Sequence, residues 1–150
     1  MKFVFILGLL LLSIAQSALA TLGEHESKIS DNEVKVLKVR AQKIIHNSNY
    51  TVHELTLDAT TLKEYADSSG AVFAVTWQGI RVPDFSVIMG TYFAEYSAER
   101  AKTPIVRGRR YVDLKTNSLV FNSGGHMRNL HGIVYLPAKV PPGVDLNSLQ

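Results

Sequence analysis

The segment of the chain with the greatest potential for chemistry is SGGHMR, residues 123–128. Its two glycines allow the backbone to turn tightly or to let a ligand approach closely. Histidine is a common acid–base group and metal ligand in proteins; the segment contains His126, and Arg128 adds a cationic donor. The segment therefore predicts a ligand-binding loop with His126 and Arg128 as polar contacts and His53 as a third candidate.

The same segment also fits a purely structural interpretation. Two glycines between predicted strands are typical of a β-bulge or a hairpin bend, in which His126 would bond to the backbone. Ser123 precedes the glycines instead of lying between them, so the GxSxG pattern of nucleophilic hydrolases is absent. Both interpretations stay open from the sequence.

A metal site is a further hypothesis, because imidazole and thioether groups suit copper or zinc. The residues that could contribute are His53, Glu54, His126, Met127 and His131. Their spacing matches no recognised metal motif, and His126 and His131 are five positions apart across a predicted turn. The sequence therefore assigns no metal ligand and identifies no cofactor.

A basic loop and a pair of acids complete the candidates. Residues 100–110 contain five cations and no acid, which suits anionic lipid, an acidic glycan, an acidic partner or simply solvent. Aromatic residues do not alternate with these cations, so a platform for single-stranded nucleic acid is not indicated. Glu54 and Glu64 lie on neighbouring predicted strands, but nothing places them in an apolar pocket where their pKa values would separate.

Hydrophobic periodicity locates the elements that must position these residues. Residues 21–29 are polar and are predicted to be loose. Ser30 and Glu33 form a capping box, and apolar residues at helical spacing follow as far as Ile45, which predicts an N-terminal amphipathic helix. Asp84 is suited to cap a long helix that reaches about Arg100, with a wide apolar stripe for packing on a sheet.

Within this helix, Gly90 is expected to allow close approach to the sheet. Strands are predicted at 50–58, 62–66, 71–77, 111–114, 119–122 and 130–136. The first three form an antiparallel meander. The predicted fold class is therefore α+β, an antiparallel sheet with one long helix packed on it and an N-terminal amphipathic helix.

The N-terminus has the features of an export signal. Lys2 precedes an apolar run over residues 3–12, and a small and polar stretch ends in Ala18-Leu19-Ala20. The apolar run is shorter than the roughly 20 residues that span a bilayer. We therefore expect a signal peptide over residues 1–20, cleavage near Ala20, and one globular domain over residues 21–150 without a transmembrane segment.

Composition narrows the class of protein. The chain has no cysteine, so an exported domain must rely on its core without disulfides. Lys and Arg number 16 against 13 Asp and Glu, for a formal net charge of +3. This small excess argues against nucleic acid as a partner.

Four phrases carry a resemblance to a known family: YTVHELTL, GAVFAVTWQG, PDFSVIMGTYFAEY and SGGHMRNLHGIVYLPAKVPPGVDLNSL. Over about residues 21–150, the chain resembles a bacterial exported family catalogued as domain of unknown function 2844. The resemblance implies export and a single small domain, and it brings no activity, cofactor or catalytic residue. It also suggests another exported protein as a partner.

The function that the sequence favours is a non-enzymatic binding or accessory domain of the cell envelope, either periplasmic or secreted. The alternative is a small metal-binding protein or a hydrolase-like enzyme centred on the SGGHMR segment. Whether the protein is an enzyme, what it binds and how it assembles are left open at this stage.

Overall fold

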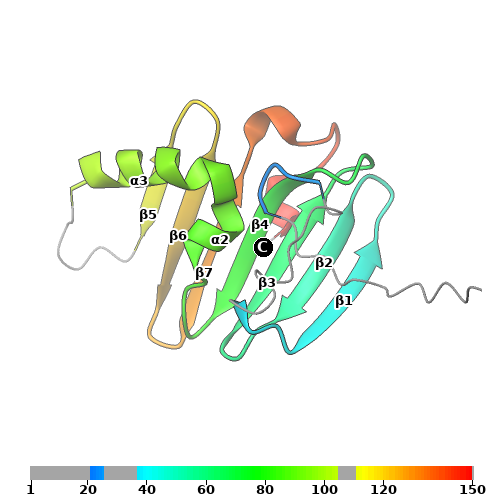
Figure 1. Ribbon diagram of the computed structural model, residues 1–150, viewed down its shortest axis with the longest axis horizontal. Coiled ribbons are helices and arrows are strands. Elements are labelled where there is room, and N and C mark those ends of the chain that lie inside the picture. The colour runs from blue at the N-terminus through cyan, green and yellow to red at the C-terminus, as the bar shows by residue number, and fades with distance from the viewer. Residues whose placement is uncertain (1–20, 26–36, 105–110, 150) are drawn as a thin grey trace, which may run out of the picture.

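Within the part of the chain that the structure describes, an antiparallel sheet of seven strands forms the centre of the protein (Figure 1). The computed structural model describes residues 21–25, 37–104 and 111–149. The strand order is β1-β2-β3-β4-β7-β6-β5. The strands are β1 (Ala41–His46), β2 (Thr51–Thr56), β3 (Thr60–Ala66), β4 (Val72–Gly79), β5 (Val112–Lys115), β6 (Val120–His126) and β7 (Asn129–Tyr135). The predicted α+β class and the antiparallel meander are confirmed.

A helical segment crosses the half of the sheet that β4, β7, β6 and β5 form (Figure 1). It consists of α2 (Phe85–Met89), a 3₁₀ turn (Gly90–Tyr92) and α3 (Phe93–Lys102). As predicted, the Asp84 carboxylate caps α2, accepting a hydrogen bond from the Ser86 amide at 2.9 Å. The predicted long helix is confirmed as a helical segment over residues 85–102, with an interruption at Gly90, whose φ of +49° breaks the regular hydrogen bonding.

The break brings the helical segment against the N-terminal residues. A Cβ on Gly90 would collide with the Thr21 side chain, so the close approach that Gly90 permits is to Thr21 and not to the sheet. Leu22 is completely buried, and its amide donates to the Ile88 carbonyl. Residues 21–25 are therefore packed, where the sequence predicted a loose segment.

The prediction that the N-terminal helix extends to Ile45 is wrong. Lys38 has a φ of +52°, in the left-handed region that ends a right-handed helix, and β1 begins three residues later. Ile44 and Ile45 are β-branched and pair with His53 and Val52 of β2, so they gain a ladder of sheet hydrogen bonds. The capping box at 30–33 and the signal peptide at 1–20 lie outside the described residues.

The two faces of the sheet are covered differently. On the first, which we call the helix face, Trp77 of β4 stacks on Phe121 of β6 with ring centroids 5.5 Å apart. Phe85 of α2 and Tyr96 of α3 pack onto the same rings. Such aromatic pairs contribute about 0.5–1.5 kcal/mol each beyond the area they bury. This cluster joins the helical segment to the sheet.

The other face, which we call the open face, is covered only in part by the residues that the structure describes. The C-terminal residues pack on it through Leu149, Val140 and Val144, against a patch that includes Tyr65 and Phe73. They include two short 3₁₀ turns, Pro137–Lys139 and Leu146–Leu149. The covered row runs across the strands from Val52 through Tyr65 and Ala74 to Tyr135. No helix among residues 21–25, 37–104 and 111–149 is long and apolar enough to cross a membrane.

The SGGHMR segment forms the end of β6 and the turn into β7. His126 pairs with Asn129, so Met127 and Arg128 make a two-residue turn, and Arg128 takes a φ of +70°. Gly125 has a φ of +123°, and a Cβ there would collide with the Asn129 carbonyl oxygen and lie 2.9 Å from the Leu130 Cα. The structural interpretation of this segment as a hairpin bend therefore describes its backbone.

The contact between Tyr65 and the C-terminal segment is open to a direct test. The buried Tyr65 hydroxyl donates to the Leu149 carbonyl at 2.5 Å. We expect Tyr65→Phe to lower the free energy of unfolding by about 1–3 kcal/mol, since it leaves a buried carbonyl without its donor. Urea unfolding measures the loss. The control is Tyr135→Phe in the same cluster, because the Tyr135 hydroxyl makes no hydrogen bond within the described residues. Equal losses of unfolding free energy in the two variants would contradict a stabilising role for the bond between Tyr65 and Leu149.

The hairpin gives a second prediction. We expect Gly125→Ala to lower the unfolding free energy by about 3 kcal/mol or more, because it combines backbone strain with a collision. Gly143→Ala is the control, since Gly143 also has a positive φ of +82° but its Cβ would meet only the Asn49 amide nitrogen at 3.7 Å. In that variant the unfolding free energy should fall by only about 1–2 kcal/mol, the cost of the backbone strain alone. Similar losses of unfolding free energy in the two variants would contradict the prediction, because they would show that the backbone moves to avoid the collision at position 125.

Candidate binding site on the open sheet face

The uncovered part of the open face carries two polar rows that the strand register defines. In the first row, Thr61 of β3, Gln78 of β4, His131 of β7 and Gly124 of β6 lie opposite one another. The second row joins Glu54, Lys63 and Thr76 across β2, β3 and β4. Because side chains alternate along a strand, all of these project away from the helix face. The rows lie next to the patch that the C-terminal segment covers.

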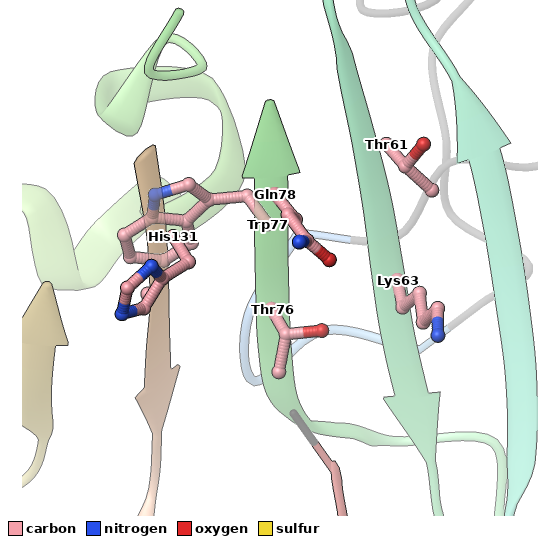
Figure 2. A pocket seen from close by; sticks show the side chains of 7 residues that line it. Thr61, Lys63, Thr76, Trp77, Gln78 and His131 are labelled. Carbon is pink, nitrogen blue, oxygen red and sulfur yellow. The ribbon is translucent and has the colours of Figure 1, made fainter. Parts of the chain in front are cut away.

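The two rows surround a hollow of about 330 Å³. Figure 2 shows the side chains that line it, which come from three adjacent strands. They are Thr61 and Lys63 of β3, Thr76, Trp77 and Gln78 of β4, and His131 and Gly132 of β7. The volume falls at the lower end of the range of about 300–1,000 Å³ that is usual for small-molecule sites.

The charge of the hollow is balanced locally. Lys63 Nζ lies 3.9 Å from Glu54 Oε2, and both side chains remain partly exposed. At this distance the ammonium keeps hydrogens for a further acceptor, while the carboxylate offsets its charge. The hollow therefore offers a strong donor without a large net field.

Thr76 is the most buried polar side chain of the hollow, at 6% exposure. Its Oγ1 lies 3.4 Å from the Tyr65 hydroxyl, whose single hydrogen is already donated to Leu149. Burial raises the pKa of Tyr65, which keeps that hydrogen in place at neutral pH. Between these two hydroxyls Thr76 is therefore the donor, which leaves the lone pairs of its oxygen as acceptors for a ligand.

Gln78 and His131 supply groups of mixed character. The Gln78 amide nitrogen donates to the Asn129 side-chain oxygen over 3.4 Å, which leaves the amide carbonyl as an acceptor. The ring of a neutral His131 has one donor and one acceptor nitrogen. With Lys63 as donor and Thr76 as acceptor, the hollow matches a ligand whose groups both donate and accept.

The floor of the hollow is built from the helix-face core. Trp77 is buried among Phe85 and Phe121, and its ring lies against the backbone of Gly132 on β7. A Cβ on Gly132 would collide with the indole and lie 2.6 Å from the Asn122 carbonyl oxygen. The packed indole therefore fixes β4 against β7 directly beneath the polar rows.

The structure brings two of the three predicted site residues together. His126 and Arg128 are exposed at the hairpin end, where they line an open depression with Ile80, Met127 and Leu130. His126 Nδ1 lies 3.2 Å from the Met127 carbonyl oxygen. His53 is 7% exposed on the helix face of β2, opposite Glu64, and does not line that depression.

The other candidates are also dispersed. His131 lies in the hollow, and Glu54 and Glu64 lie on opposite faces of the sheet. In the part of the chain that the structure describes, no three His, Cys, Asp or Glu residues are grouped to hold a metal ion. In the basic loop, Lys102 pairs with Glu99 at 3.0 Å, while residues 105–110 lie outside the described residues.

Sequence reasoning did not identify the residues of the hollow, apart from His131. A weak signal existed, because Thr61 and Lys63, and likewise Thr76 and Gln78, alternate with apolar residues. This alternation marks a polar face on each strand. It does not show that β7 lies beside β4, which is the pairing that closes the hollow.

Comparison with known proteins gives one match. The family described as "Protein of unknown function (DUF2844)" matches residues 18–149 of the chain. No curated protein and no solved structure matches the chain.

Proposed function

The chain belongs to the DUF2844 family, and we propose that it is a non-enzymatic binding domain that holds a small polar ligand in the hollow of its open face. The observation that carries the proposal is the set of donors and acceptors around one hollow on the central strands. Lys63, Thr76 and Gln78 project from strands that the helix-face core holds in place. Groups on rigid strands orient a ligand without a large cost in conformational entropy.

The proposed location is the periplasm or the outside of a bacterial cell. Its support is the sequence of the first 20 residues, in which Lys2, an apolar run and Ala18-Leu19-Ala20 form a signal-peptide pattern. Cleavage near Ala20 would leave Thr21 and Leu22 at the N-terminus, and both are buried in the fold. A ligand of the hollow would then be a component of the envelope or its surroundings.

A second candidate is an accessory role in which the hairpin end contacts another exported protein. Met127 is 86% exposed and Ile80 is 52% exposed beside the same depression. Neighbouring exposed apolar side chains are typical of a contact surface. His126 and Arg128 would supply its polar contacts.

The ligand proposal can be tested with the protein's own fluorophore. Trp77 is the only tryptophan of the chain and lines the hollow. We expect its emission to change when one or more of xylitol, glucose, galacturonate, glutamate or phosphate is titrated into the protein. Lys63→Met and Gln78→Leu should each weaken binding roughly tenfold, as expected for the loss of a hydrogen bond in a binding site.

The matched control is Lys43→Met. Lys43 lies on β1, opposite Glu54 of β2 in the strand register, and does not line the hollow. Its replacement should therefore leave the affinity for the ligand unchanged. Calorimetry of the same titrations detects binding that leaves the fluorescence unaltered. Absence of binding by both methods, or equal affinity in all three variants, would exclude the hollow as the site.

The accessory proposal has a separate test in the cell. We expect a photoreactive p-benzoylphenylalanine in place of Met127 to crosslink one envelope protein, and Arg128→Glu to abolish the product by reversing the charge beside it. The control position is Asn117, an exposed residue in the β5–β6 turn. An identical pattern of products from both positions would refute a specific contact.

A further inference from the structure

Tyr111 adds an aromatic surface beside the hollow. Its side chain is 62% exposed, although a tyrosine ring has a large apolar area. The ring atoms Cδ1 and Cε1 lie 2.6 and 2.7 Å from the position that a Cβ on Gly124 would occupy. Tyr111 therefore rests on the Gly124 backbone, with much of its ring left in contact with solvent.

The ring continues the first polar row at its outer end. Gly124 lies directly opposite His131, and His131 Nε2 is 3.6 Å from the same Cβ position. Since His131 lines the hollow, Tyr111 and the hollow share one face and one row. Between β3 and β6 the row crosses three strand spacings, about 14 Å, which is the length of about three pyranose rings.

The chemistry of this row fits one class of ligand. A sugar ring has an apolar face of C–H groups, which packs on an aromatic ring, and a rim of hydroxyls, each of which both donates and accepts hydrogen bonds. Tyr111 offers the aromatic face, Lys63 a donor and Thr76 an acceptor. The Glu54 carboxylate beside Lys63 offsets the positive charge that an acidic sugar would need.

We infer that the hollow binds a neutral oligosaccharide laid across β3, β4, β7 and β6, with Tyr111 as the platform for its terminal ring. This inference rests on the proposed function and names the ligand class of the same site. Gly124 is needed for this platform because it leaves room for the Tyr111 ring. Any side chain there would collide with the ring and displace it from its place beside His131.

The probes for the test are neutral oligosaccharides of one to six units, built from glucose or N-acetylglucosamine, titrated into the purified protein by calorimetry. Affinity should rise with length up to about three units and then level off, because the row accommodates about that number of rings. Tyr111→Leu should weaken the longer probes roughly tenfold, because it keeps apolar cover on Gly124 but removes the ring. Tyr111→Trp should retain affinity.

Two further variants separate the ring's placement from the stability of the fold. Gly124→Ala should weaken the longer probes while leaving Tyr111 in the chain, and urea unfolding of each variant shows whether the fold is intact. Tyr111→Leu and Gly124→Ala should leave the affinity for a monosaccharide almost unchanged.

Other outcomes distinguish the two proposals. Binding of galacturonate or phosphate that depends on Lys63, with no preference for longer neutral sugars, would overturn the oligosaccharide inference and leave the proposed function standing. If Tyr111→Leu and the unaltered protein bind oligosaccharides of every length with equal affinity, the role of Tyr111 as a platform is overturned. No binding of any probe would overturn both proposals.

Discussion

The contact between the Trp77 indole and the Gly132 backbone is the constraint on which the rest of the structure depends. The ring can lie against β7 only because position 132 has no side chain. From there it stacks on Phe121 and meets Phe85, so one residue joins the middle of the sheet to the helical segment. Close packing of this kind leaves little room for adjustment. The strands beneath the hollow are therefore held in one arrangement.

Because the helix face buries this apolar cluster, the opposite face is free to be polar. The C-terminal segment covers one end of that face, where Tyr65 holds it through the Leu149 carbonyl. The remaining end carries Lys63, Thr76 and Gln78 on the central strands. The hydrogen bond that anchors this cover also uses the single hydrogen of the Tyr65 hydroxyl, so Thr76 is the donor where the two hydroxyls meet.

The two glycines of the SGGHMR segment have different structural parts. Gly125 allows the hairpin to close against the backbone of β7, and Gly124 makes room for the Tyr111 ring. Both glycines shape the surface of the open face beside His131. The side chains that first drew attention, His126 and Arg128, lie at the exposed end of the same hairpin.

The sequence by itself determined the α+β class, six of the seven strands and the Asp84 cap, since these depend on periodicity and on contacts between near neighbours. It did not reveal β1, because Ile44 and Ile45 fit a helical as well as a strand pattern and only pairing with β2 decides between them. It also did not reveal the hollow. Lys63 and Thr76 lie on consecutive strands of the predicted meander, but His131 is far from both in the chain, and only the tertiary structure, by placing β7 beside β4, brings it onto their face. Long-range strand pairing is set by how side chains pack across the sheet, and no local pattern records it.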